Sequence, residues 1–189
     1  MILVDSNVII DVLTQDATWR LWSEAALIDA ANRDEIAINP IIYAEIASGF
    51  ATMAALDHHL GEFRRLALPY EADFIAGRAF VEYRRRGGVR TSPLPDFYIG
   101  AHAAVAGLTL MTRDARRYSG YFPKVELIAP DRAGLTGSSG GDHVDGRGRA
   151  RPGARVIAGP AAPVSPESAC RRLSAAGATP SVIAASARP

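Results

Sequence analysis

The sequence predicts an α/β domain in which a small parallel β-sheet is flanked by helices. Short apolar runs such as Ile2-Leu3-Val4 and Ile36-Ala37-Ile38 alternate with longer stretches that show helical periodicity. Strands that alternate with helices favour a parallel sheet covered on both faces. The first run stops at an acid, and the carboxyl ends of parallel strands are where sites form. The acid that follows the first run, Asp5, therefore lies where a functional site is expected.

Two parts of the 189-residue chain differ in composition. All 14 aromatic residues lie at or before Phe122, and residues 1–130 carry 13 basic and 16 acidic residues, net −3. Residues 131–189 carry 8 arginines against 4 acids, and 35 of these 59 residues are Ala, Gly, Ser or Pro. Such a segment buries too little apolar surface to offset its ordering entropy. We therefore expect one domain over 1–130 and a disordered tail over 131–189.

The composition of the tail also suggests how this segment arose. Of the 21 basic residues in the chain, only Lys124 is lysine, which indicates a GC-rich coding sequence. Reading past a normal stop in such DNA would produce an Ala/Gly/Pro/Arg-rich segment. Residues after about 133 are therefore predicted to be an aberrant extension. A native mass near 20.1 kDa would contradict this.

The first half of the domain is predicted to hold three strands and four helices. Asp5-Ser6-Asn7 offers capping residues before a short helix over 8–13, and Pro40 suits the first position of a helix over 41–49. Further helices are expected over 18–32 and 53–66, and strands over 2–4, 36–38 and 66–68.

The second half continues the alternation. Residues 71–86 form an amphipathic pattern with Phe74, Ile75, Ala79, Phe80 and Val81 as apolar positions, ended by a Gly-Gly pair. Pro95-Asp96 opens a helix through 106, which Gly107 ends. Strands are expected over 108–112 and 125–128, with a short helix from Asp114 between them.

Composition excludes several classes of protein. The single cysteine, Cys170, rules out an internal disulfide framework and a cysteine-based zinc site. No apolar run reaches the roughly 18 residues of a membrane span, and no secretory signal is visible. No nucleotide-binding glycine loop occurs. A cytoplasmic protein without a membrane partner is expected.

Four acids occupy positions that suit a metal site. Asp5 and Asp114 follow predicted strands, Asp96 begins a helix, and Glu45 lies in a helix rich in isoleucine. In a parallel sheet these carboxylates would meet at one edge and repel one another. A hard divalent cation relieves that repulsion, and oxygen ligands suit Mg²⁺ or Mn²⁺.

Each acid also has a simpler interpretation. Asp5, Asp96 and Asp114 could be helix caps that complement the helix dipole. Glu45 sits among apolar residues and should need a partner if it is buried, for which an arginine would suffice.

The motifs resemble those of PIN domains. Ile2-Leu3-Val4-Asp5-Ser6-Asn7 resembles the first motif of that family, and 41–46 with Glu45 resembles the second. Residues 94–101 with Asp96 resemble the third, and Thr112-Arg113-Asp114 after a strand resembles the fourth. All four occur in order over 1–130, and the compact form is similar to VapC toxins of toxin–antitoxin pairs.

The resemblance implies a three-layer fold and a Mg²⁺- or Mn²⁺-dependent endoribonuclease. Asp5, Glu45, Asp96 and Asp114 would be the metal-binding and catalytic acids, with Ser6, Asn7 and Thr112 orienting them. It also implies an RNA substrate, a VapB-like antitoxin that blocks the site, and a homodimer.

Arg84, Arg85, Arg86 and Arg90 form the one dense basic cluster of the domain. They would contact RNA phosphates, or they would simply be a solvated helix end whose cations favour the dipole. Two other functions stay open: a non-catalytic module that acts with an antitoxin on operator DNA, and a PIN nuclease outside any toxin pair.

Overall fold

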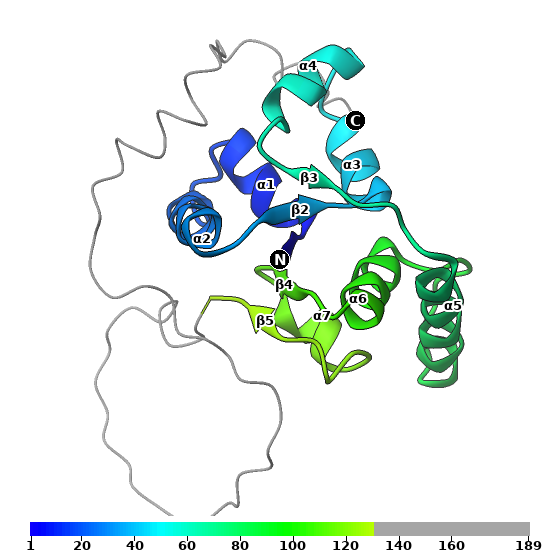
Figure 1. Cartoon of the computed structure of the whole chain (residues 1–189). Helices are drawn as coiled ribbons and strands as arrows, with labels where there is room; N and C mark the ends of the chain where they lie inside the picture. Colours follow the sequence, from blue (N-terminus) through cyan, green and yellow to red (C-terminus); the bar gives the residue numbers. More distant parts are fainter. Residues whose placement is uncertain (131–189) are drawn as a thin grey trace, which may run out of the picture.

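The computed structural model describes residues 1–130, which form a five-stranded sheet flanked by helices (Figure 1). The predicted tail over 131–189 lies outside the described residues. Every strand pair is parallel, and the strand order is β3-β2-β1-β4-β5. The strands are β1 (Ile2–Val4), β2 (Ile36–Ile38), β3 (Arg64–Arg65), β4 (Thr109–Met111) and β5 (Leu127–Ile128). The predicted α/β class with a small parallel sheet is confirmed.

Seven helices connect and cover these strands within residues 1–130. They are α1 (Ser6–Leu13), α2 (Arg20–Arg33), α3 (Pro40–Ala47), α4 (Met53–His59), α5 (Tyr70–Arg85), α6 (Pro95–Ala106) and α7 (Ala115–Ser119). Figure 1 shows α2 on one side of the sheet and α5, α6 and α7 on the other. Helix α3 contacts both α1 and α6. The helices that carry the motif acids are thereby brought together.

The core lies where the central strands meet these helices. Leu3, Val4 and Leu110 have no exposed surface, as expected for strands covered on both faces. Val4 is aligned with Met111, and the amide of Asp5 donates to the carbonyl oxygen of Met111 over 2.9 Å. Strand β1 is therefore fixed in register beside β4, which sets the two strand ends level with each other.

Local sequence signals explain where several helices begin and end. Asn39 caps α3 by accepting hydrogen bonds from the amides of Ile41 and Ile42, both at 3.0 Å. Pro95 occupies the start of α6, and Gly107 ends it with φ +63°, a conformation that glycine adopts at little cost.

Two predicted elements near β3 were wrong in extent. Helix α4 ends at His59 instead of continuing to residue 66, and the strand is Arg64–Arg65 instead of 66–68. Both arginines are exposed on an edge strand that pairs with β2. The apolar run was a poor signal here because an edge strand needs backbone partners and not a buried side-chain face.

Helix α5 buries two alanines most deeply, and only part of its predicted apolar set packs against the core. Ala72 and Ala76 are fully buried, whereas Phe74 is 72% exposed and Tyr70 is 89% exposed. The helix contacts α6 extensively, and alanines allow the two helix axes to approach. Of the large side chains, Phe74 and Val81 are exposed, whereas Phe80 is half-buried and packs against the core. Among the described helices, none combines the length and apolarity required to cross a membrane.

Candidate metal-dependent active site

The four predicted acids meet at the carboxyl edge of the sheet, where the strand order reverses. From β1 the chain moves to β2 on one side, whereas β4 joins β1 on the other. Asp5 follows β1 and Asp114 follows β4, while Glu45 lies on α3 and Asp96 in the first turn of α6. Such a reversal point is the usual binding crevice of open α/β sheets.

Asp5 is the buried centre of the cluster, with only 2% of its surface exposed. Its Oδ2 accepts three hydrogen bonds, from Asn7 Nδ2 (2.7 Å), Thr112 Oγ1 (2.8 Å) and the Tyr118 hydroxyl (2.9 Å). Its Oδ1 has a more distant neighbour, the Ser6 hydroxyl at 3.4 Å. The side chain is thus fixed through one oxygen, and the other is the oxygen available to a cation.

Glu45 is tied to the first motif by a neutral partner. The Ser6 hydroxyl donates to Glu45 Oε2 over 2.8 Å, a closer contact than the one it makes with Asp5. The expected alternative of an arginine ion pair for Glu45 is not what residues 1–130 contain: no basic side chain lies within salt-bridge distance of it. The carboxylate therefore keeps a free oxygen beside Asp5.

Asp96 and Asp114 share one cation. Arg117 Nη1 donates to Asp96 Oδ2 over 2.9 Å, and Arg117 Nε donates to Asp114 Oδ2 over 2.8 Å. Asp114 is the N-cap residue of α7, yet its side chain makes no capping hydrogen bond, and the same is true of Asp5 at α1. These two acids face the cluster, so the helix-cap interpretation does not account for them.

Asn7 and Thr112 connect the two strand ends. Asn7 Nδ2 also donates to Thr112 Oγ1 (3.1 Å), and the Asp114 amide donates to that same hydroxyl oxygen (3.1 Å). Asn7 Oδ1 accepts from the Arg113 amide (3.3 Å). The Thr112 hydroxyl thus donates a hydrogen bond to Asp5 and accepts one from the Asp114 amide. Asn7 and Thr112, the predicted supporting residues, both link the ends of β1 and β4.

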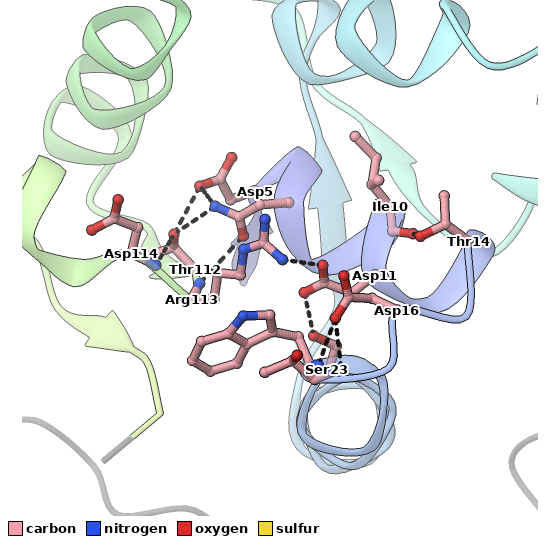
Figure 2. A network of polar contacts seen from close by, with 12 residues as sticks. Asp5, Ile10, Asp11, Thr14, Asp16, Ser23, Thr112, Arg113 and Asp114 are labelled. Atoms are coloured by element: carbon pink, nitrogen blue, oxygen red, sulfur yellow. Dashed lines mark hydrogen bonds and ion pairs between the residues drawn. The ribbon is translucent and has the colours of Figure 1, made fainter. Parts of the chain in front are cut away.

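Arg113 fixes the loop after β4 from outside the acidic cluster. Figure 2 shows its side chain between Asp5 and Thr112 on one side and Asp11 on the other. Arg113 forms an ion pair with the buried Asp11, which also accepts from the Ser23 hydroxyl over 2.9 Å. Its guanidinium lies 5.9 Å from the Trp19 ring centroid. Helices α1 and α2 are thereby joined to the loop that carries Thr112 and Asp114.

Burial dominates the electrostatics of the cluster. Desolvation raises the pKa of Asp5, although hydrogen bonds from Thr112 and Tyr118 oppose it and the nearby Asp96 adds to it. Desolvation likewise raises the pKa of Glu45, with further contributions from Asp5 and Asp96. Burial and the same carboxylates raise the pKa of Tyr118 well above its ordinary value, so its hydroxyl stays protonated and donates. The site disfavours its own negative charge.

The donor set fits a hard divalent cation, and two of its four acids already pair with an arginine. Carboxylate oxygens that repel one another are the ligands Mg²⁺ and Mn²⁺ prefer. Within residues 1–130, however, no three Asp, Glu, His or Cys side chains are already grouped to hold an ion. The Arg117 guanidinium occupies oxygens of two of the four acids. The residues fit the metal by chemistry, and Arg117 stands where it would compete.

The predicted basic cluster makes other contacts. Arg84 donates to the carbonyl oxygen of Arg90 (2.8 Å), and Arg86 pairs with Glu82 (2.9 Å) and lies over the Tyr121 ring. These residues lie at the end of α5 and in the loop that leads to α6. These contacts lie within the cluster, to Glu82 on α5 and to Tyr121, and the role in RNA contact remains a prediction.

Sequence reasoning missed Arg117 and Tyr118. Both follow Asp114 on α7 by about one helical turn, at i+3 and i+4, and this spacing was the available signal. An arginine or tyrosine one turn after a site acid lies on the same face as that acid.

A parallel α/β domain with a cluster of acids at the reversal point of its sheet defines the class of protein. Residues 2–123 match the model of the PIN domain family, and the chain therefore belongs to that family. The resemblance expected from the four motifs is confirmed.

Solved structures with the same fold come from toxin–antitoxin complexes. The chain is similar to one in VapBC2 from Rickettsia felis bound to a promoter DNA fragment, with TM-score 0.54, 20% identity and coverage of 69% of this chain and 100% of that one. It is also similar to one in VapBC-1 from nontypeable Haemophilus influenzae, with TM-score 0.53, 17% identity and coverage of 68% and 98%. At such identities the likeness shows the fold. No curated protein sequence matches the chain.

Proposed function

We propose that this chain is a Mg²⁺- or Mn²⁺-dependent endoribonuclease and the toxin of a VapC-type toxin–antitoxin pair. The observation that carries the proposal is the convergence of Asp5, Glu45, Asp96 and Asp114 on one edge of the sheet, with Asp5 fixed through a single oxygen. The family match over residues 2–123 supports it. The shared fold with chains of VapBC complexes is consistent with the toxin assignment.

The residues divide the work of the site between them. Asp5 Oδ1 and the carboxylates of Glu45, Asp96 and Asp114 would hold the metal. Asn7, Thr112 and Tyr118 keep Asp5 in place, and Ser6 orients Glu45. A bound ion supplies the chemistry of phosphodiester hydrolysis: it binds a phosphate oxygen, activates water and stabilises the leaving oxygen.

Several partners follow from the same proposal. The substrate is RNA in the cytoplasm, and the arginines at 84–86 and 90 would contact its phosphates by their charge. The antitoxin is VapB-like and blocks the acidic edge. The chain acts as a homodimer, for which the exposed aromatic side chains of α5, Tyr70 and Phe74, are the available apolar surface.

Amide substitutions test the nuclease. Asp5→Asn and Asp96→Asn each remove one ligand charge with little change in shape, so both are expected to abolish RNA cleavage while leaving the circular dichroism spectrum unchanged. Asp73→Asn, which alters an acid of α5 outside the cluster, is the matched control and should cleave normally. Full activity of either site variant in metal-defined buffer would refute the assignment. Sequencing RNA ends after brief induction of wild type and Asp5→Asn would identify the target.

A second candidate function is regulatory. VapBC2 from Rickettsia felis was solved on a promoter DNA fragment, so a chain of this fold can be part of a DNA-bound complex. Here the chain would contribute assembly on operator DNA and no catalysis. Growth arrest on induction that Asp5→Asn relieves would favour the nuclease, whereas absence of both arrest and cleavage would favour the regulatory module.

A further inference from the structure

Arg117 is the cation of the acidic cluster. Among residues 1–130 it is the one basic side chain within salt-bridge distance of any of the four site acids, and it contacts two of them. Its neighbour Arg116 lies on the same short helix and forms no ion pair with any of the four acids. The contact is therefore a property of this position and not of a generally basic surface.

The guanidinium and a divalent cation would compete for the same oxygens. Arg117 nitrogens lie 2.8–2.9 Å from one oxygen each of Asp96 and Asp114. A metal ion must approach such oxygens to about 2.0–2.6 Å, and two cations at one carboxylate pair repel each other. Because the guanidinium already neutralises these two carboxylates, a metal ion bound to them would be repelled by it, so the two cations compete for the pair.

Arg117 can leave its position at small cost. Its side chain is 61% exposed, whereas Asp96 beneath it is 17% exposed. Displacement would return a flexible, well-hydrated side chain to solvent and break no buried packing. Replacing the guanidinium by a metal ion would need little rearrangement of the backbone, because Asp96 stays on α6 and Asp114 stays at the start of α7.

We propose that Arg117 is an intramolecular competitor of the metal: it neutralises Asp96 and Asp114 in the metal-free protein and must release them before a divalent cation binds. This inference rests on the proposed function, since it concerns the same site. As a consequence, a higher concentration of the metal ion is needed to occupy the site than the four acids alone would require. Arg117 is in this sense a regulatory residue of the site.

The test measures Mn²⁺ binding to the full 189-residue chain by calorimetry in RNA-free buffer. Arg117→Met removes the competing cation and is expected to bind Mn²⁺ about tenfold more tightly, which corresponds to about 1.4 kcal/mol. Arg116→Met removes the same charge from the same helix and should stay within about twofold of wild type. Arg117→Lys keeps the charge but cannot span two carboxylates as well, and should lie between.

Thermal unfolding provides a second readout that needs no activity. Without metal, Arg117→Met should melt below wild type because Asp96 and Asp114 lose their neutralising partner. Saturating Mn²⁺ should raise its melting temperature by more than it raises that of wild type.

The possible outcomes distinguish failure of this inference from failure of the proposed metal-dependent function. Equal or weaker Mn²⁺ binding by Arg117→Met would overturn the competition, as would an equal gain in Arg116→Met, while the metal site itself would stand. If neither wild type nor Arg117→Met binds Mn²⁺, both the inference and the proposed metal-dependent function fall.

Discussion

Asp5 is held by hydrogen bonds that do not remove the cost of its burial. Three donors converge on Oδ2, yet the pKa of the carboxyl is raised by desolvation. An acid whose pKa is raised on folding binds protons more tightly in the folded state, so stability falls as pH rises above its ordinary value of 3.8. Burying the ionised carboxylate of Asp5 therefore lowers the folding stability of the metal-free protein.

Replacing that charge should therefore stabilise the protein while disabling it. Asp5→Asn keeps an oxygen to accept from Asn7, Thr112 and Tyr118, and removes the buried charge. We expect a higher melting temperature than wild type in EDTA at pH 7.5, with the gain shrinking as pH falls toward 4. Differential scanning calorimetry would check it. A lower melting temperature at pH 7.5 would show that the hydrogen bonds outweigh desolvation.

At the same scale, the sequence predicted the acids better than their partners. Asp5 and Asp114 follow strands, and Asp96 begins a helix, so spacing indicated their positions; Glu45, inside α3, was found from its apolar neighbours and its motif. The contacts of Arg117, Tyr118 and Arg113 depend on how α7 and the loop after β4 fold back over β1. Spacing shows which face of α7 they share with Asp114 but not which side chain meets which.

At the scale of elements, a buried polar pair joins the helices that carry two of the acids. Asn39 Oδ1 already accepts from two amides of α3, so its amide group donates to His102 Nδ1 on α6, 3.2 Å away. His102 therefore carries its proton on Nε2 and is neutral. Burial lowers its pKa, and protonating it would place a charge beside a donor in the core.

This pair predicts a loss of stability in acid. A base with a lowered pKa in the folded state takes up protons more readily when unfolded, so its contribution is intact above about pH 6.5 and declines as pH falls below that value. Between pH 7.5 and 5.5 the stability of wild type should fall relative to that of His102→Gln, which can still accept from Asn39. Urea unfolding at each pH would measure the difference, and parallel curves would contradict it.

Close packing of α6 against the end of the domain gives a second prediction. A Cβ built on Gly100 would lie 2.4 Å from the Phe122 ring and 3.0 Å from Tyr118. Gly100→Ala should destabilise the protein by about 1–3 kcal/mol through overpacking, and should also weaken Mn²⁺ binding by shifting Tyr118 away from Asp5. Gly77→Ala in α5 meets nothing within 4 Å and should instead stabilise by about 0.5–1 kcal/mol. Urea denaturation of both variants decides whether the effect comes from crowding.

Elements that bury an apolar face were the predictable part of the fold. The central strands followed from apolar runs, and the starts of α3 and α6 followed from Pro40 and Pro95 in their first turns. Strand β3 and helix α5 departed from the pattern for opposite reasons. The first is held by backbone pairing at an edge, and the second packs by alanine and leaves Phe74 in solvent.

At the scale of the whole molecule, charge and composition divide the chain near residue 130. All the described strands and helices lie within residues 1–130, which carry net −3, while residues 131–189 carry net +4. The domain boundary stays a prediction from composition, which expects a segment without aromatics to build no core of its own. Whether the two parts are independent is open to direct measurement.

Removing residues 131–189 should leave the domain intact. We expect the 1–130 chain to match the full chain in melting temperature within about 2 °C and in Mn²⁺ affinity within about twofold, since the five strands and the four site acids all lie within residues 1–130. Calorimetry on the two chains would check both. Loss of solubility or a much lower melting temperature would show that the domain extends further than predicted.

The three donors to Asp5 are synthesised at very different times. Asp5 emerges from the ribosome almost at once, but Thr112 and Tyr118 lie 107 and 113 residues later. At about 5–20 residues per second, the last of these donors is made roughly 6–20 s after the acid it holds. A nascent chain therefore carries Asp5 and Asn7 long before Thr112 and Tyr118, the other two donors that position the acid. A chain cut short before Tyr118 would have no complete site, so any activity appears only when nearly the whole domain has been made.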